Sequence, residues 1–307
     1  MSIEHVGMNP GFTHHNLAPE VEALGFDSIW VSEHIVFHGA VAESMTVLSY
    51  YAAAAPTLKL GTAVYLMPLR HAMITAKTAA TLDYISGGRL ILGIGVGGEY
   101  PKEFEACGVP IKQRGGRTDE AIIASKKLWS GEPVSHEGKY YSFSDVKLEP
   151  PPAQPGGPPV WVAGRSDAAI RRAALLGDGY LPYLFTPERY RASLQKVNEL
   201  AAAAKRPPDA ITPAHYVQFH LGSSTEESRK VAGDMMSANY NQDFHSLVER
   251  FLALGTAADA AEFIYRFVDG GAKTIILIPA CAPEAVPDQV RRAGEDLLPL
   301  LRGAHRS

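Results

Sequence analysis

Two neighbouring residues with acid–base chemistry, Glu33 and His34, follow the apolar segment Phe26–Ser32 (FDSIWVS). An imidazole in this position can act as a base, donate a hydrogen bond to a ligand, or satisfy its polar atoms inside a core. The residue types leave these three roles open. Polar residues directly after a buried strand nevertheless indicate a functional site, because parallel strands present their carboxyl ends to ligands.

An anion-binding segment is indicated by Gly164–Asp167 (GRSD), which links the apolar run Val160–Ala163 to a helix predicted over Ser166–Leu176. The first turn of a helix offers free N–H groups and the positive end of the dipole. Arg165 adds a charge and Ser166 adds a hydroxyl, although this serine could also serve only as a helix cap. A place on a late barrel strand favours the phosphate site.

A third segment is rich in glycine and ends the apolar run Arg89–Gly95. Glycine has no Cβ, so Gly95, Val96, Gly97 and Gly98 would let a planar ligand approach the backbone closely. The same glycines could serve only as an exit from the strand. No acidic residue stands on a following strand at the distance that a dinucleotide fingerprint requires, so we do not assign a dinucleotide site.

Metal and nucleophile chemistry are weaker alternatives. Five histidines could offer nitrogen ligands, namely His14, His15, His34, His38 and His71. Their spacing matches neither HxH nor HExxH, and no carboxylate pattern completes a ligand set. The GxSxG elbow of serine hydrolases is also missing from the sequence.

The elements that must position these residues alternate between strand and helix. Strands are predicted at Ile3–Met8, Phe26–Ser32, Lys59–Val64, Arg89–Gly95, Val160–Ala163, Gly179–Leu181, His215–Leu221 and Thr274–Ile278. Helices are predicted at His14–Leu24, Met45–Ala55, Ala72–Ile85, Arg117–Trp129, Ser166–Leu176, Pro187–Ala204 and Ala257–Phe267, with another capped by Ser224 and Glu227 and a last one ending at Leu301.

This alternation predicts the α/β class and a single (β/α)8 TIM barrel over residues 1–307. Residues 99–158 interrupt the pattern and are interpreted as an insertion, with a loop over Glu99–Gly116 and a hairpin over Ser135–Phe143. A doubly wound open sheet is the alternative fold.

Composition limits the partners. The net charge of -4 and the pI near 6.3 argue against nucleic acid and anionic membrane surfaces. Only Cys107 and Cys281 are present, which is too few for a disulfide framework and fits a reducing compartment. The sequence has no leader pattern and no apolar run of membrane-spanning length, so we expect a cytoplasmic protein with a small-molecule substrate.

With these residues assembled, the chain resembles the bacterial luciferase-like monooxygenase family, especially its branch dependent on coenzyme F420. The resemblance rests on blocks spanning about 160 residues, which are GFDSIWVSEH (25–34), LKLGTAV (58–64), ATLDYISGGRLILGIGVGG (80–98), EFEACGVP with RGGRTDE (103–120), EGKYYSF (137–143) and PVWVAGRSDAAIRRAALLGDGYLP (159–182).

The resemblance implies a TIM barrel with insertions, a homodimer, and a flavin or deazaflavin at the strands' carboxyl ends. It implies that His34 lies near the ring and transfers a proton, and that Ala63-Val64 is a cis peptide behind the ring. The remaining implied cofactor contacts are Glu33, Gly95, Val96, Gly97, Gly98, Gly164, Arg165 and Ser166.

Three departures from the family pattern stand out. Gly98 replaces the acidic residue of the family's sugar-phosphate dehydrogenases and the tryptophan of many other members, which argues against glucose-6-phosphate oxidation unless Glu99 takes that place. Glu33 replaces a commoner aspartate. The loop after His34 and the first helix are shorter than usual, which predicts a more open substrate entrance.

The sequence therefore predicts an oxidoreductase that transfers a hydride between coenzyme F420 and an unidentified small organic substrate. Monooxygenation with reduced FMN is the alternative, because both cofactors carry a phosphate for Ser166. A flavin-binding protein without catalysis and a metal-dependent barrel hydrolase are weaker alternatives. Tyr65, Met67, Tyr183, Phe185 and His220 are candidates for the pocket lining.

Overall fold

The computed structural model describes residues 2–11, 16–240 and 242–303. Its strands are β1 (His5–Met8), β2 (Ser28–Val31), β3 (Lys59–Thr62), β4 (Tyr65–Leu66), β5 (Leu90–Gly95), β6 (Val134–Glu137), β7 (Ser142–Val146), β8 (Val160–Ala163), β9 (Gly179–Leu181), β10 (Thr212–Leu221), β11 (Ala253–Gly255) and β12 (Thr274–Pro279).

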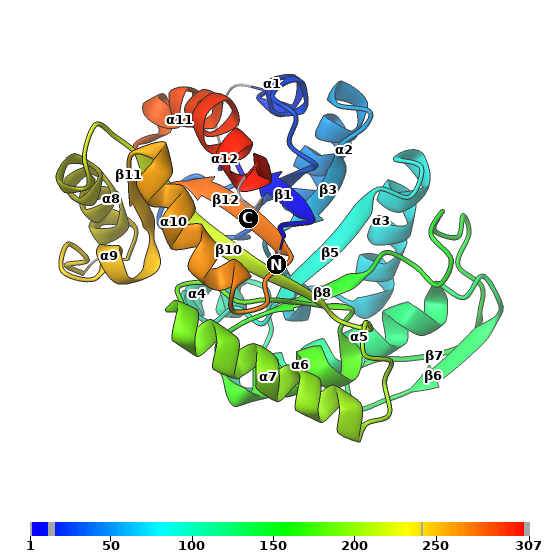
Figure 1. Ribbon diagram of the computed structural model, residues 1–307. Helices are drawn as coiled ribbons and strands as arrows, with labels where there is room; N and C mark the ends of the chain where they lie inside the picture. The colour runs from blue at the N-terminus through cyan, green and yellow to red at the C-terminus, as the bar shows by residue number, and fades with distance from the viewer. Residues whose placement is uncertain (1, 12–15, 241, 304–307) are drawn as a thin grey trace.

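The helices surround the strands (Figure 1). They are α1 (Ala18–Ala23), α2 (Ser44–Ala54), α3 (Ala72–Ile85), α4 (Pro101–Ala106), α5 (Arg114–Leu128), α6 (Asp167–Leu176), α7 (Pro187–Ala203), α8 (Thr225–Tyr240), α9 (Val248–Phe251), α10 (Ala257–Val268), α11 (Val286–Arg292) and α12 (Leu298–Gly303). Shorter helical segments are η1 (Met67–Leu69), η2 (Ile111–Gln113), η3 (Pro283–Ala285) and η4 (Ala293–Leu297).

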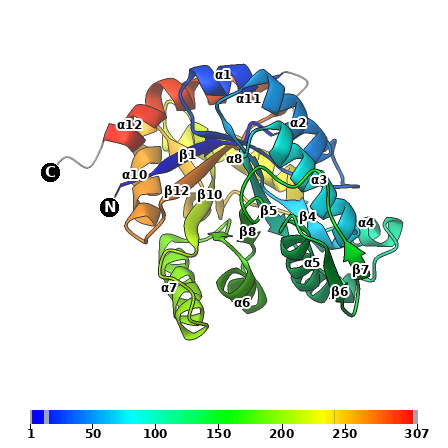
Figure 2. The ribbon, with the colours of Figure 1, turned by 90° about the vertical axis from the view of Figure 1, so that its right-hand side faces the viewer.

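Eight parallel strands of the described chain close into a barrel. Their order around the barrel is β12, β1, β2, β3, β5, β8, β9 and β10, and β10 pairs with β12 to complete the circle. Figure 2 shows the strands enclosed by the outer helices. The closed circle confirms the predicted TIM barrel and excludes an open sheet, which would leave two unpaired edges.

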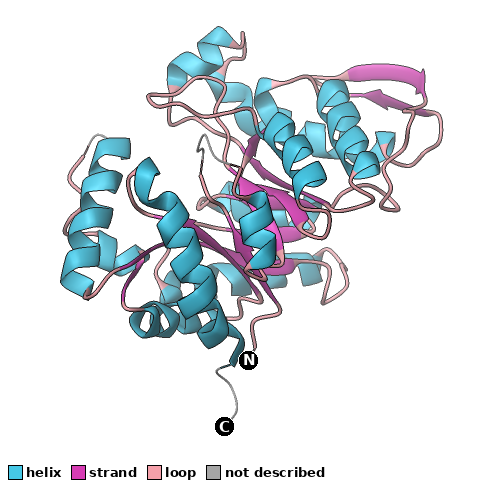
Figure 3. Cartoon of the chain, turned by 90° about the horizontal axis from the view of Figure 1, so that it is seen from above, coloured by secondary structure: helices cyan, strands magenta, loops and turns pink. Residues whose placement is uncertain are grey.

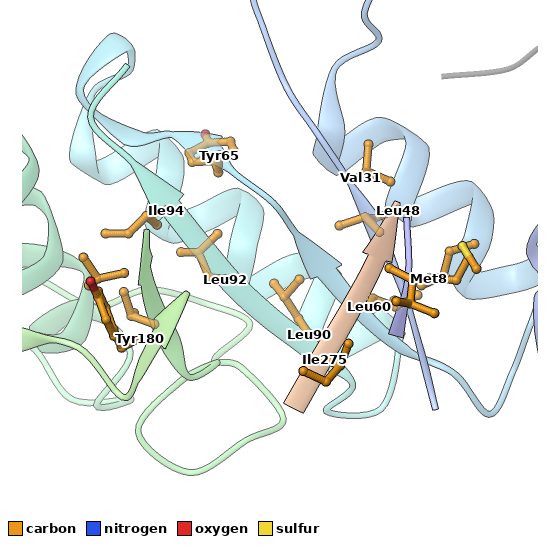
Figure 4. Close-up of a cluster of buried hydrophobic side chains, with 14 of the residues drawn as sticks. Met8, Val31, Leu48, Leu60, Tyr65, Leu90, Leu92, Ile94, Tyr180 and Ile275 are labelled. Atoms are coloured by element: carbon orange, nitrogen blue, oxygen red, sulfur yellow. The ribbon is translucent and has the colours of Figure 1, made fainter. Parts of the chain in front are cut away.

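The main apolar core lies between the barrel strands and the helices. Leu60, Leu90 and Leu92 project outward from neighbouring strands and are fully buried (Figure 4). Inside the barrel, Trp30 and Trp161 pack with their ring centroids 5.4 Å apart. Gly61 is required beside Trp30, because a Cβ on this glycine would lie 2.1 Å from the indole ring.

The segment between β5 and β8 contains more helix than the sequence predicts. The expected loop over Glu99–Gly116 includes α4 and η2, and α5 begins at Arg114 rather than at Arg117. Pro101 opens α4 because its ring suits the first turn of a helix. The sequence does not predict the first turn of α5, because two adjacent glycines stand there and glycine has a low helix propensity.

Other boundaries shift by smaller amounts. The predicted strand Lys59–Val64 divides into β3 and β4, and the predicted helix His14–Leu24 begins in residues outside the described ones and continues as α1. The expected capping box of α8 is incomplete: Ser224 accepts the Glu227 N–H, but the Glu227 carboxylate accepts from the N–H and hydroxyl of Ser223.

The antiparallel hairpin β6–β7 lies outside the ring of helices, beyond α5 (Figure 3). Glu120 of α5 secures the hairpin turn by accepting hydrogen bonds from the backbone N–H groups of Lys139, Tyr140 and Tyr141. The predicted hairpin is therefore present, and it lies at the periphery of the barrel. Among the described residues, no helix is both long and apolar enough to cross a membrane.

Candidate functional site

The carboxyl ends of the barrel strands form one rim, which we call the mouth. Strand β2 leads into Glu33–His34, β3 into Ala63–Val64, β5 into Val96–Gly98, and β8 into Gly164–Ser166. Strands β2, β3, β5 and β8 are consecutive in the barrel. The four segments that the sequence singles out therefore occupy neighbouring positions on one side of the mouth.

His34 is held by a carboxylate from another part of the mouth. Its Nδ1 lies 3.3 Å from each carboxylate oxygen of Glu103 in α4. The His34 side chain is 19% exposed, whereas the Glu103 side chain is fully buried. A carboxylate on Nδ1 favours the tautomer that carries its proton there, and Nε2 is then available for a ligand.

Glu103 also fixes the loop that follows His34. Its Oε1 accepts hydrogen bonds from the N–H groups of Ile35, at 2.6 Å, and Val36, at 3.3 Å. These contacts satisfy the charge of a buried carboxylate, which would otherwise be strongly unfavourable. Glu103 thus joins the β2 loop to α4 and determines how the imidazole of His34 sits.

Aromatic side chains cover part of His34. Phe37 stacks on the imidazole with ring centroids 3.9 Å apart and an interplanar angle of 11°. Phe37 and His38 both contact Tyr100, the residue before α4. The short loop after His34 therefore still lies over one face of the imidazole, while the expected wider substrate entrance stays a prediction.

Glu33 points into the protein and has a full set of partners. Its two oxygens accept from Nη1 and Nη2 of Arg70 at 2.7 and 3.1 Å, and one of them accepts from the Ser44 hydroxyl at 2.6 Å. The N–H groups of Leu66 and Ser44 complete the network. Glu33 consequently ties the β2 end to α2 and η1, and its carboxylate has little capacity left for a ligand.

The segments after β3 and β5 pack closely against each other through the Val64 side chain. The peptide bond Ala63-Val64 is cis, as the resemblance implies. A Cβ on Gly95 would lie 2.5 Å from Val64 Cγ2, so only glycine allows this approach. Gly97 and Gly98 have φ values of +61° and +120°, in the region that favours glycine. The glycines thus allow the segments after β3 and β5 to pack closely at the mouth.

The segment after β8 forms the exposed N-terminal end of α6. Ser166 is the N-cap of α6, and its Oγ accepts from the Ala169 N–H at 3.2 Å. Gly164 adopts a φ of +128°, and both Arg165 and Ser166 are exposed. The Ser166 hydroxyl keeps its hydrogen for an anion, because it accepts rather than donates in the cap.

One hydrogen bond crosses the mouth between β5 and β9. The Tyr183 hydroxyl donates to Glu99 Oε1 at 3.0 Å, and the Arg165 guanidinium lies 5.0 Å from the centre of the Tyr183 ring. Glu99, which the sequence allowed as a substitute for a side chain at Gly98, is thus directed toward Tyr183.

Polar side chains close the interior end of the barrel below the mouth. Asn9 is fully buried, and its Nδ2 donates to the Ser32 hydroxyl at 3.0 Å and to the Tyr216 hydroxyl at 2.8 Å. Gln218 stands two residues after Tyr216 in β10, so it shares the inward face of that strand. Its Oε1 is buried without a hydrogen-bond partner among the described residues.

Most side chains suggested for the pocket lining lie elsewhere. Tyr65, Met67 and Phe185 are buried in the main apolar core. His220 is paired through Nδ1 with the Ser228 hydroxyl at 3.0 Å, and burial lowers the pKa of His220. Tyr183 alone among the five lies at the mouth. The other four could not be placed correctly, because the sequence does not reveal which face of each strand turns inward.

The described residues contain no group of three or more His, Cys, Asp or Glu side chains that could hold a metal ion. Among the histidines considered as ligands, His34 contacts Glu103, and His71 caps α3 by accepting from the Met73 N–H. His14 and His15 lie outside the described residues.

Comparison with known proteins identifies the family. The profile of the luciferase-like monooxygenase family matches residues 12–269, which is most of the chain. The chain belongs to the luciferase-like monooxygenase family. This membership and the relatives described next confirm the predicted family and the prediction of an enzyme of oxidation and reduction.

Two curated relatives of this luciferase-like chain are reducing or dehydrogenating enzymes. The 5,10-methylenetetrahydromethanopterin reductase of Methanolobus tindarius is 29% identical over 230 residues, covering 75% of this chain and 68% of that protein. The F420-dependent glucose-6-phosphate dehydrogenase of Kineococcus radiotolerans is 33% identical over 172 residues, covering 54% and 50%.

The luciferase-like fold is also found in a solved structure of an F420-dependent secondary alcohol dehydrogenase in complex with an F420-acetone adduct. The two chains superpose with a TM-score of 0.85 over 98% of this chain and 99% of the other, at 19% sequence identity. At this identity the similarity shows the shared fold alone.

Two residues that organise the mouth of this luciferase-like chain cannot be recognised from the sequence pattern. Glu103 falls within a block that resembles the family, and Arg70 stands outside the segments whose residue types indicate chemistry. Their partners are distant in sequence, since Glu103 contacts His34 and Arg70 contacts Glu33. Glu103 stands two residues after Pro101, and this spacing indicates the start of a helix. The spacing does not identify His34 as the partner of Glu103.

Proposed function

We propose that this protein binds coenzyme F420 at the mouth and transfers a hydride between the coenzyme and a small organic substrate. The observation that carries the proposal is the order of the segments along the mouth, where the cis peptide Ala63-Val64 and the glycine-rich segment Gly95–Gly98 stand between His34 and the capped end of α6. When bound, the deazaflavin supplies a ring carbon that gives or takes the hydride.

The residues present fit such a group. Gly95 lets the Val64 side chain pack against the end of β5, and the positive φ values of Gly97 and Gly98 turn the backbone there, so the glycines shape the part of the mouth where a planar ring would lie. Gly164, Arg165 and Ser166 offer a charge, a hydroxyl and a helix N-terminus to its phosphate. The buried Oε1 of Gln218 could accept a hydrogen bond from a donor on the ligand.

His34 manages the proton that accompanies the hydride. Glu103 accepts from Nδ1, so Nε2 is the atom that takes a proton from a substrate alcohol or returns one to a substrate carbonyl. Burial of Glu103 and the stacked ring of Phe37 exclude water from one side of this pair. Glu33 acts indirectly in this proposal, because its contacts with Arg70 and Ser44 anchor the residue before His34.

The choice of cofactor is tested by titrating the protein with coenzyme F420 and with FMN, followed by turnover with each reduced cofactor in air and under anaerobic conditions. We expect F420 to bind more tightly and turnover to proceed without oxygen over a panel of alcohols, ketones and imines. Tight FMN binding with oxygen-dependent turnover would instead support the monooxygenase alternative, which the family's name favours.

A further inference from the structure

The guanidinium of Arg114 lies beside the glycine loop of the mouth. A Cβ placed on Gly98 would be 3.1 Å from Arg114 Nε and 3.5 Å from its Cζ. The missing side chain of Gly98 therefore makes room for the arginine. Helix α5 follows β5, so its first residue, Arg114, lies on the side of the barrel where the strands end.

Arg114 lacks a counter-charge among the described residues. No carboxylate of that part of the chain lies within 4 Å of its guanidinium, and its Nη1 donates a hydrogen bond to the Ile111 carbonyl at 3.0 Å. A guanidinium has five N–H groups, so most of its donor capacity is unused.

Three other partly buried arginines have fuller sets of partners than Arg114. Arg70 is paired with Glu33, and Arg172 is paired with Asp119. Arg89 donates to the carbonyls of Ala52, Ala55, Leu58 and Ser86. Arg114 also begins a helix whose first turn contains no acidic residue, a position where the helix dipole disfavours a cation. Helix stability does not explain Arg114.

We infer that Arg114 binds an anionic group, a carboxylate or a phosphate, of a ligand at the mouth. A planar guanidinium fork matches both groups and can bind either of them through two hydrogen bonds. The anion belongs to the cofactor or to the substrate, and the choice between them rests on the proposed function. The anion site itself does not depend on that proposal.

The test compares the wild type with Arg114→Met, Arg114→Lys and the matched control Lys112→Met, which removes an exposed cation two residues earlier. One arm measures the dissociation constants of coenzyme F420 and of its chromophore without the phosphate. The other arm titrates the F420-loaded protein with inorganic phosphate and with acetate, following deazaflavin fluorescence. Thermal unfolding verifies that each variant is folded.

If the cofactor supplies the anion, Arg114→Met should weaken F420 binding about tenfold or more and leave the chromophore unaffected. If the substrate supplies the anion, F420 binding should be unchanged and the response to phosphate or acetate should weaken by a similar factor. Arg114→Lys should keep part of either effect. Equal behaviour of Arg114→Met, Lys112→Met and the wild type in both arms would overturn the inference.

Failure of the proposed function is recognised separately, because the wild type would then bind no deazaflavin. In that case the cofactor-free protein is titrated with inorganic phosphate while the NMR signal of the Arg114 Nε–H is followed. A saturable shift of that signal supports the anion site, and an unchanged signal contradicts it.

Discussion

Glu103 places a fully buried carboxylate against the imidazole of His34, and this contact favours one of the two tautomers of the histidine. A neutral imidazole exchanges between two tautomers, and only one of them leaves Nε2 without a proton. Because Glu103 also accepts from two backbone N–H groups, its own position is fixed. The pair therefore has the geometry of a base and its positioning residue.

Replacing Glu103 by alanine should change the His34 tautomer in a protein that still folds. We expect ¹⁵N NMR to show the proton on Nδ1 in the wild type and on both nitrogens in Glu103→Ala. We also expect kcat to fall about 100-fold with little change in KM, because general acid–base catalysis contributes factors of this order.

The control for Glu103 is Glu105→Ala, since Glu105 is exposed on the same helix. Glu103→Asp tests for partial rescue by a shorter carboxylate. An unchanged tautomer with a reduced kcat in Glu103→Ala would contradict the positioning role and would indicate that Glu103 only stabilises the loop.

At the scale of elements, the periodic parts of the barrel could be predicted and the contacts between elements could not. Strands β8 and β9 and helix α3 match their predicted bounds, because apolar runs and helical spacing are local properties. Helix α4 was missed because its six residues carry too little periodic signal. The Glu33–Arg70 and His34–Glu103 pairs join segments 37 and 69 residues apart, which no local pattern encodes.

Helix α6 allows its capping role to be separated from its binding role. Ser166→Ala should lower the free energy of unfolding by about 1 kcal/mol through loss of the N-cap. Thr256→Ala removes the equivalent cap of α10 and should cost a similar amount. Only Ser166→Ala should weaken coenzyme F420 binding, by roughly tenfold. Equal F420 affinities of the two variants would argue against a phosphate site at α6; fluorescence titration and urea unfolding provide both measurements.

Strand β10 carries a buried titratable group on its outer face. His215 packs between Tyr190 and Phe267, and burial lowers the pKa of His215 to about 3. Between pH 6.5 and about 3 the unfolded chain binds a proton at this histidine that the folded chain does not bind. The free energy of unfolding should therefore decrease with acidification, by up to about 1.4 kcal/mol per pH unit from this residue.

Urea unfolding at pH 7, 6 and 5 measures this dependence. His215→Phe should reduce the pH slope by one proton's contribution, while removal of the exposed His38 by His38→Asn should leave it unchanged. His5, whose pKa is lowered to about 4 chiefly by burial, accounts for part of the slope that remains. A slope identical in the wild type and His215→Phe would show that His215 is accessible to protons in the folded state.

At the scale of the whole molecule, four of the eight large apolar side chains that are exposed among the described residues lie on two adjacent helices. Tyr50 of α2 and Ile74, Tyr84 and Ile85 of α3 are each exposed by 56 to 60%, and the two helices pack side by side. Exposed large apolar side chains on adjacent helices are typical of a subunit interface. We propose that these side chains form the interface of the homodimer implied by the family resemblance.

Charged substitutions should separate the subunits. Ile74→Lys combined with Ile85→Lys places two charges on the α3 face, so light scattering after size exclusion should change from a dimer to a monomer. Ile123→Lys, on the neighbouring helix α5, is the control for surface charge in general. A wild type that is monomeric at micromolar concentration would contradict the proposed interface.

The closure of the barrel has a consequence for how the protein is made. The first strand, β1, pairs with the last strand, β12, and β12 also pairs with β10. While the chain is being synthesised, β1 and β10 keep open edges until residues 274–279 emerge from the ribosome. Open edges attract other strands. Chains interrupted before Thr274 should therefore aggregate or depend on chaperones, whereas the completed chain leaves no such edge in its barrel.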